Sequence, residues 1–269
     1  MLTRRTFVGL GASGVGAFAI GAGADGAPQA DVPPHYFLLE SYLLKNGSQA
    51  QRLGSYFQLA RISMANRLQT VAPAIVLEAL VAAHMPQVLV VSAFASLDQL
   101  AGLKRKLRED GPARDALAEW EAGQEAPYEE LNETVLEAAE YCPSLPSPMP
   151  SPGPVSKLPR VFELRTYHSP TERQLRALHE RFAGPEIRIF QRCGIHPLLY
   201  SSTLIGAGKP NLTYLTPFDD LAAREKAWAA FNADPEWVKV RAESIAKHGQ
   251  ISSVIQMSLF KAAGYSPMR

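Results

Sequence analysis

The residues best suited to chemistry lie in one short segment, VFELRTY, at residues 161–167. Its alternation and its β-forming residues predict a strand. Glu163, Arg165 and Tyr167 then share one face, because side chains alternate along a strand with a period of two. On this face Arg165 could anchor an oxyanion, Glu163 could serve as an acid or base, and Tyr167 could donate a hydrogen bond to a ligand.

The direction of that face decides what it can reach. We expect the alternate residues Phe162 and Leu164 to point toward helices, which leaves the polar face in the space between two sheets. Charges in such a space must be paired or hydrated. The same pattern also fits a cross-strand ion pair that only fixes the register.

Histidine is the natural general base near neutral pH. His179 follows Leu175 by four residues and precedes Phe182 by three, which places it near the inward face of a helix. It is our candidate acid or base, and His196, which we expect to begin a strand, is a candidate ligand contact. Either histidine also fits a hydrogen-bonded core position.

Four further residues are candidate ligand contacts. Tyr200 and Tyr214 lie on adjacent expected strands, and Glu40 and Tyr42 hold the equivalent positions in a first copy of the unit, described below. Aromatic residues on strands also serve packing alone. Arg241, one turn after Trp237, is expected to stack, to pair with a nearby glutamate, or to reach a ligand.

Other kinds of site lack their motifs. The six histidines show no metal-binding spacing such as H-x-H, so we expect no dedicated metal site. The glycine pair Gly206 and Gly208 falls between expected strands rather than before a helix, which disfavours nucleotide binding. No motif indicates a cofactor, so cofactor content stays open.

Composition and charge narrow the partners. Of 269 residues, 46% are apolar and 20% charged, which suits ordinary globular domains. The formal charge is only +1, and nucleic acids and anionic membranes demand concentrated positive charge. We therefore expect a small-molecule ligand and no nucleic acid. Cys142 and Cys193 allow at most one disulfide, and the sequence does not establish whether they meet.

The N-terminus reads as an export signal. Arg4 and Arg5 precede an uncharged, weakly apolar run at residues 9–24, a pattern typical of a twin-arginine leader. The run ends in an A-x-A site, so residues 1–24 are expected to be removed. The run is short for a membrane span. We expect a periplasmic or secreted protein of a prokaryote, without stable membrane insertion after cleavage.

The remaining chain divides in two at a proline-rich segment. Residues 142–159 contain seven prolines, which favour an extended spacer. A shift of 125 residues then matches Phe37, Tyr42 and Phe57 to Phe162, Tyr167 and Phe182, among others. After a one-residue slip, a shift of 124 continues the match through Asp110 and Asp234. Such register indicates a duplicated unit, which we place at residues 33–141 and 160–262.

Each copy predicts the order β-α-β-β-α-β of a ferredoxin-like unit. Strands are expected near 35–42, 74–81, 87–94 and 134–141, and at 161–167, 196–203, 211–218 and 254–260. Helices are expected near 48–69 and 97–121, after residue 169, and at 219–244 with an interruption near 232–235.

The ELRTY core of the first strand in the second copy, and the DPEW step in its late helix, resemble the NIPSNAP family. The resemblance covers residues 160–262, and residues 35–141 only through the repeat. It implies the dimeric α/β-barrel superfamily, in which two units pair sheet to sheet and enclose a cavity. Relatives in that superfamily include cofactor-free oxygenases, haem-handling proteins, isomerases and dechlorinating enzymes.

Together these features predict an α+β protein in which two tandem ferredoxin-like units form a fused α/β barrel. We expect it to bind or transform a small molecule, with any single active pocket on the side of the second copy. The alternative is a non-catalytic partner or delivery protein for another exported protein. A homodimer through a remaining sheet surface is also compatible with this architecture.

Overall fold

The computed structural model describes residues 35–64, 74–143 and 160–267. The expected leader at residues 1–24 lies outside the described residues, as does most of the expected linker, residues 144–159. We call residues 35–143 the first half of the chain and residues 160–267 the second half.

Eight antiparallel strands close a barrel in the order β1-β3-β2-β8-β5-β7-β6-β4. Four strands come from each half, in the ferredoxin-like order, and the pairs β2–β8 and β4–β6 join the halves. The predicted fused barrel of two βαββαβ units is confirmed. The strands are β1 (Tyr36–Leu43), β2 (Ala74–Val81), β3 (Gln87–Phe94), β4 (Glu130–Ala138), β5 (Val161–His168), β6 (Leu199–Ile205), β7 (Asn211–Phe218) and β8 (Val254–Ala262).

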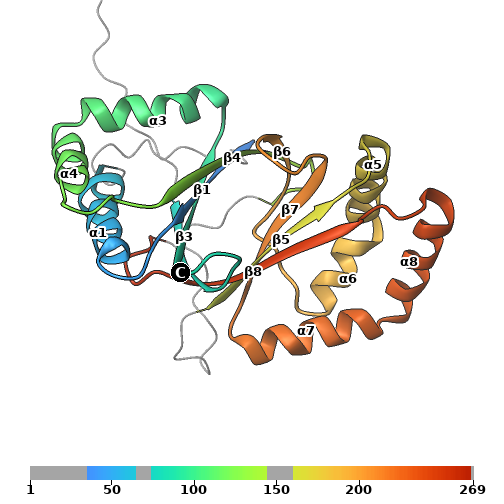
Figure 1. Cartoon of the computed structure of the whole chain (residues 1–269). Helices are drawn as coiled ribbons and strands as arrows, with labels where there is room; N and C mark the ends of the chain where they lie inside the picture. Colours follow the sequence, from blue (N-terminus) through green and yellow to red (C-terminus); the bar gives the residue numbers. More distant parts are fainter. Residues whose placement is uncertain (1–34, 65–73, 144–159, 268–269) are drawn as a thin grey trace, which may run out of the picture. The chain divides into compact units, whose positions relative to one another are not determined.

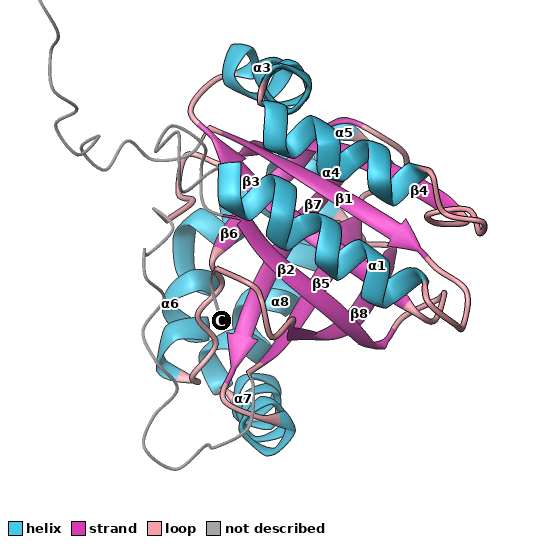
Figure 2. Cartoon of the chain, turned by 90° about the vertical axis from the view of Figure 1, so that its left-hand side faces the viewer, coloured by secondary structure: helices cyan, strands magenta, loops and turns pink. Residues whose placement is uncertain are grey.

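Helices cover the outer face of the barrel, those of the first half over their own strands and those of the second half over theirs (Figure 1). Figure 2 shows α1 lying across the strands of the first half. The first half has α1 (Gln49–Tyr56), the π-helix η1 (Phe57–Ile62), α3 (Leu97–Glu109) and α4 (Gly111–Glu121). The second half has α5 (Glu172–Arg181), η2 (Phe182–Glu186), α6 (Ile187–Arg192), α7 (Leu221–Ala233) and α8 (Pro235–His248). No described helix is both long and apolar enough to cross a membrane.

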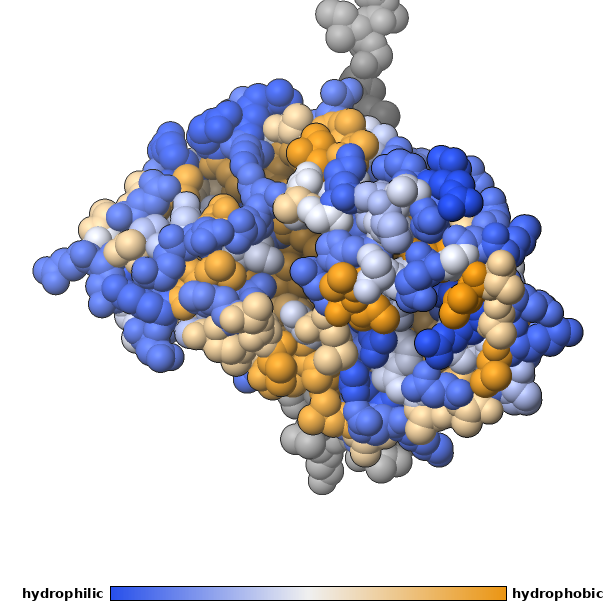
Figure 3. All heavy atoms as spheres, turned by 45° about the vertical axis from the view of Figure 1, so that its right-hand side comes forward, coloured by the Kyte–Doolittle hydropathy of each residue, from blue (hydrophilic) through white to orange (hydrophobic). Residues whose placement is uncertain are grey.

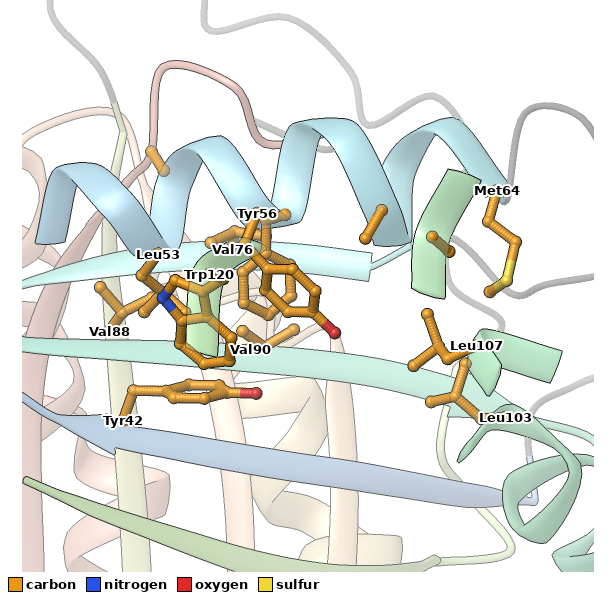
Figure 4. Packing of buried hydrophobic residues seen from close by; sticks show 14 of the residues in the cluster. Tyr42, Leu53, Tyr56, Met64, Val76, Val88, Val90, Leu103, Leu107 and Trp120 are labelled. Atoms are coloured by element: carbon orange, nitrogen blue, oxygen red, sulfur yellow. The ribbon is translucent and has the colours of Figure 1, made fainter. Parts of the chain in front are cut away.

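Three apolar clusters result from this layering. One contains residues of all eight strands and none from a helix, among them Phe37, Phe162 and Phe260, so it fills the interior of the barrel. The other two lie between sheet and helices, one in each half. Figure 4 shows part of the first-half cluster, with Leu53 and Trp120 packed over the strands. An eight-stranded barrel has an interior just wide enough for side chains, which explains the filled centre.

Two of the matched positions are helix caps. The side chain of Asp110 accepts a hydrogen bond from the backbone of Ala113, and that of Asp234 accepts from Glu236 and Trp237. Each aspartate ends one helix and starts the next, since its carboxylate satisfies backbone N–H groups of the following first turn. The helix expected at 97–121 is therefore divided in two, and the interruption expected near 232–235 in the later helix is confirmed.

Two strands differ from the prediction in their bounds. β6 begins at Leu199 rather than at His196, because Pro197 has no N–H to donate to a strand ladder. β4 spans Glu130–Ala138 rather than 134–141, because the chain turns where Cys142 donates to the carbonyl of Ala139. Both cysteines are free thiols.

Candidate functional site

The polar face of β5 points toward the helices of the second half. Phe162 belongs to the cluster inside the barrel, whereas Tyr167 packs with Leu178 and Phe182 under the helices. The predicted orientation, with Glu163, Arg165 and Tyr167 in the space between two sheets, is therefore wrong. The narrow interior takes the apolar side chains, so the polar groups of β5 occupy the layer between sheet and helices.

Glu163 is the centre of this polar layer. Its side chain has no exposed surface, and it accepts hydrogen bonds from Arg165 and from Arg224 of α7. A third donor is the indole of Trp228, whose Nε1 lies 3.2 Å from Oε2. A buried carboxylate needs such partners to remain charged. Glu163 thus fixes the positions of two arginines and is fully engaged in doing so.

Arg165 lies over an aromatic ring. The central carbon of its guanidinium is 3.8 Å from the centre of the Trp228 ring, the geometry of a cation–π contact. Its Nη1 donates to the hydroxyl of Tyr167 at 3.4 Å. The hydroxyl of Tyr214 also donates to that oxygen, at 2.8 Å. Because burial raises the pKa of Tyr167, its own proton stays on and can be donated to a ligand.

A pocket of about 420 Å³ opens beside these groups, between β5, β8 and the second-half helices. Its walls carry four arginines and aromatic rings from α7 and α8. The surface on this side of the molecule is mainly hydrophilic, with separate apolar areas (Figure 3). The residues that define its chemistry are Arg165, Tyr167, Arg181, Glu186, Arg224, Glu225, Trp228, Trp237 and Arg241.

Glu186, like Arg181 and Arg224, is a residue of this pocket that the sequence did not single out. It lies in η2, is 1% exposed, and accepts a hydrogen bond from Arg181 Nε at 2.6 Å. Burial raises the pKa of its carboxyl to about 7, because desolvation of the carboxylate outweighs the attraction of Arg181. A carboxyl that titrates near neutral pH inside a pocket is suited to exchange protons with a ligand.

Among the four arginines of the pocket, Arg241 is the one without a partner in the described part of the chain. The guanidinium groups of Arg165, Arg181 and Arg224 each face a glutamate. Arg241 is exposed and has no hydrogen-bond or ion-pair partner among the residues that the structure describes. The four arginines outnumber Glu163, Glu186 and Glu225, so this region carries an excess of positive charge.

His179 has other partners than Glu163 and Tyr167, whereas Tyr200 packs against Phe182 and Tyr214 in the second-half core. The Nδ1 of His179 is 2.7 Å from the hydroxyl of Tyr141, and its Nε2 is 2.7 Å from Oγ of Ser202 on β6. Burial lowers the pKa of His179, so the ring is neutral. Tyr141 packs edge-on against Tyr200. The structure therefore does not bring His179 together with Glu163 and Tyr167, and both of its nitrogens have partners.

The remaining predicted residues lie in different parts of the structure. Tyr214 donates a hydrogen bond to the hydroxyl of Tyr167, as described above. His196 is exposed in the connection before β6. Glu40 and Tyr42 lie on the helix-facing side of β1, where Glu40 forms a buried ion pair with Arg61. Within the described ranges, no three His, Cys, Asp or Glu side chains gather in a way that could hold a metal ion.

The repeat relates this ion pair to the pocket of the second half. The 125-residue shift places Arg165 on Glu40, and Glu186 on Arg61. In the first half the two charges touch; in the second half their signs are exchanged and both residues line the pocket. In the sequence, Arg61 and Glu186 each directly precede a matched isoleucine, Ile62 and Ile187. The exchange of arginine for glutamate at this position is the signal that could have identified Glu186.

Comparison with known proteins agrees with the fold. Residues 162–267 match the model of the NIPSNAP family, so the second half of the chain is similar to that family. No curated protein matches the chain. A Lactobacillus acidophilus protein provisionally assigned as a monooxygenase is similar in structure, with 7% identity, a TM-score of 0.53, and coverage of 85% of this chain and 94% of that chain.

Two further solved structures are similar. An anthrone oxidase-like protein has 11% identity and a TM-score of 0.51, with coverage of 87% of this chain and 93% of that chain. A NIPSNAP-like domain protein from Burkholderia xenovorans has 24% identity and a TM-score of 0.35, with coverage of 40% of this chain and 89% of that chain. At such identities the first two comparisons support a fused α/β barrel and leave chemistry to the residues of the site.

Proposed function

We propose that the second half of the chain binds a small organic anion in the pocket beside Arg165, and that Glu186 exchanges a proton with it. The observation that carries the proposal is the pocket itself. It is lined by four arginines, of which Arg241 has no acidic partner in the described chain. An anionic ligand supplies the missing negative charge.

The pocket walls suggest how such a ligand is held. Arg241 receives a carboxylate, and the aromatic rings of Trp228 and Trp237 pack against an apolar body. A carbonyl oxygen of the ligand accepts hydrogen bonds from Arg165 and Tyr167. The volume of about 420 Å³ falls within the usual range for a small-molecule site.

Proton transfer at a carbon beside that carbonyl is the reaction these groups favour. Ionised Glu186 removes a proton from this carbon, and the electron pair of the broken C–H bond forms an enolate. Arg165 and Tyr167 stabilise the enolate oxygen. Protonated Glu186 then returns the proton to a carbon of the ligand, so the step needs no oxidant or reductant. Glu186 takes the acid–base role that the sequence assigned to His179 or Glu163.

The binding step is tested with phenylacetate and its neutral isostere phenylacetamide, by calorimetry on the full chain. We expect phenylacetate to bind and phenylacetamide to bind at least tenfold more weakly. Arg241→Gln should weaken phenylacetate about tenfold, since a charged hydrogen bond contributes about 1.5–3 kcal/mol. Arg176→Gln, an exposed arginine of α5 outside the pocket, is the matched control. Equal affinities for the acid and the amide would refute anion binding.

The chemical step has its own readout. Phenylpyruvate exchanges its methylene protons in D2O through its enol, and NMR follows the loss of signal. We expect the protein to accelerate exchange and Glu186→Gln to abolish the acceleration while phenylacetate still binds. Binding without acceleration would limit the function to ligand capture.

A second function is favoured by the edge of β8. The register between β2 and β8 begins at Leu259, so among the described residues the stretch 254–258 pairs with β5 alone. Val254, Ile255 and Met257 in this stretch are 42–53% exposed. An unpaired, apolar strand edge suits addition of a strand from a partner protein, or from a second copy in a homodimer. Native mass spectrometry of the full chain and of Met257→Lys distinguishes a monomer from an edge-paired dimer.

We also propose export through the twin-arginine route, on the leader motif alone. That assignment places the protein in the periplasm or outside the cell.

A further inference from the structure

The first half of the chain contains a cavity of its own. Its volume is about 560 Å³, and it lies between β1, β4 and the helices α1, α3 and α4. Its mouth is rimmed by exposed side chains that include Lys104 and Ile205, the latter 63% exposed. The cavity is separate from the arginine-lined pocket, because the two share no lining residue.

The repeat explains why space is left here. The 124-residue shift places Trp228 on Lys104, and Phe231 on Leu107. In the second half both rings are buried in the core under the helices. In the first half Lys104 instead turns outward and pairs with Glu133 at 2.7 Å, and Leu107 is smaller than a phenylalanine. Two large rings are thus missing from the layer between sheet and helices.

Aromatic residues form one wall of this cavity. The rings of Tyr56 and Trp120 are stacked, with centroids 4.5 Å apart and planes at 6°, and Tyr42 contacts Trp120 edge-on. Leu103 and Leu107 form the opposite wall. Figure 4 shows the hydroxyls of Tyr42 and Tyr56 directed toward the side on which these leucines lie. The cavity therefore offers an apolar space that is faced by hydroxyl groups.

The floor of the cavity is electrically neutral. The carboxylate of Glu40 is engaged by Arg61, whose Nη2 also donates to Ser92 at 3.2 Å, and by the hydroxyl of Tyr42 at 3.3 Å. These charges cancel at contact distance, so neither is available for a charged ligand. A buried ion pair that is already satisfied disfavours a second charge beside it.

Tyr56 supplies a hydrogen-bond donor to the cavity. Its hydroxyl has no hydrogen-bond partner within the described part of the chain, although the residue is only 6% exposed. Burial raises the pKa of Tyr56 to about 12, so the hydroxyl keeps its proton and can donate it. A ligand oxygen in the cavity would satisfy this donor.

We propose that this cavity binds a neutral, largely apolar aromatic molecule that carries a hydroxyl or carbonyl oxygen, which accepts a hydrogen bond from Tyr56. The ring system packs between the aromatic wall and the leucines, where uncharged apolar surface is removed from water. The first half is then a binding domain in its own right. Its ligand is neutral, whereas the ligand of the second half is an anion.

The probe is 1-naphthol, titrated calorimetrically into the full chain, with naphthalene-1-sulfonate as its charged counterpart. We expect saturable one-to-one binding of 1-naphthol and at least tenfold weaker binding of the sulfonate. Leu100→Trp fills the cavity and should weaken 1-naphthol at least tenfold. Leu97→Trp makes the same change three residues earlier on α3, at a position 41% exposed and outside the cavity, and should leave the affinity within twofold.

Two further variants keep the test decisive. Tyr56→Phe should weaken 1-naphthol about threefold to tenfold through loss of one hydrogen bond. If Leu100→Trp loses its cooperative thermal transition and is therefore not folded, Tyr56→Phe alone tests the cavity. Arg241→Gln should leave 1-naphthol binding unchanged. The proposal is overturned if the full chain does not bind 1-naphthol, if the sulfonate binds equally well, if folded Leu100→Trp or Tyr56→Phe binds like the wild type, or if Arg241→Gln alters the affinity.

Discussion

Arg61 donates through one nitrogen, Nη1, to both carboxylate oxygens of Glu40, at 2.9 and 2.8 Å, and both side chains are at most 8% exposed. The equivalent residues of the second half, Glu186 and Arg165, carry the opposite charges and pair with other partners instead. The same two positions of one ancestral unit thus hold a closed ion pair in one copy and face an open pocket in the other.

The ion pair between Arg61 and Glu40 predicts that substitutions of the two residues have strongly non-additive effects on the free energy of unfolding. Arg61→Met or Glu40→Leu alone leaves one buried charge without its partner and should lower the free energy of unfolding by about 3–5 kcal/mol. The double variant removes both charges and should lose much less than the sum. Urea unfolding of the four proteins measures this coupling. Lys104→Met, which breaks the partly exposed pair with Glu133, should cost about 1 kcal/mol or less. Additive effects of the two buried substitutions would contradict the argument.

Glu186 predicts a pH dependence of stability. Its folded pKa of about 7 lies above the ordinary value of 4.5, so the folded state holds the proton more tightly than the unfolded state. Its contribution is therefore fully present below about pH 4.5 and is lost as the pH rises through 7. A shift of this size corresponds to about 3 kcal/mol.

The measurement compares wild type with Glu186→Gln by urea unfolding between pH 4.5 and 8. Gln cannot titrate, so the variant should lack this part of the decline, and the difference between the two curves should grow with pH. Parallel curves would show that Glu186 titrates in its ordinary range.

The sequence was sufficient for the architecture and insufficient for the site, for a physical reason. The repeat and the strand patterns place all four strands of each half, because alternation and turn residues are local signals. Alternation along β5 separates Phe162 from Glu163 but does not say which side lies inside a closed barrel. That choice depends on the width of the interior, which is a property of all eight strands together. Glu186 was missed because its role comes from burial under other helices.

Trp228 links the stability of the site to its electrostatics. Its indole donates to Glu163 and its ring supports the guanidinium of Arg165. Trp228→Phe removes the donor and keeps a ring, so we expect a loss of about 1–2 kcal/mol in the free energy of unfolding and weaker phenylacetate binding. Phe231→Leu changes a pocket-lining ring on the same helix that makes no polar contact, and it should lower stability and affect the affinity less.

His179 should prove structural. Because both of its ring nitrogens are engaged by Tyr141 and Ser202, His179→Phe should lower the melting temperature by several degrees through the loss of two buried hydrogen bonds. Phenylacetate binding and deuterium exchange of phenylpyruvate should remain near the wild-type level. A selective loss of exchange at unchanged stability would restore His179 as the acid or base.

We expect export to depend on Arg4 and Arg5 of the leader. Changing Arg4 and Arg5 to lysine keeps the charge and removes the paired guanidinium groups, so export by the twin-arginine route should stop. Fractionation of cells that express the tagged full chain should then find the protein only in the cytoplasm, and at its precursor mass. Unchanged export of the double variant would indicate a different route.

The wide helical turns η1 and η2 begin at Phe57 and Phe182, residues that the repeat places on one another. An interruption shared at equivalent positions dates from before the duplication, so the ancestor already carried it when it was a single unit that needed a second copy to close its barrel. The differences between the copies, a proline within η2 and the exchanged charges, arose after the duplication. Once both halves were on one chain, each could diverge without disturbing an identical twin, which a symmetric dimer cannot do.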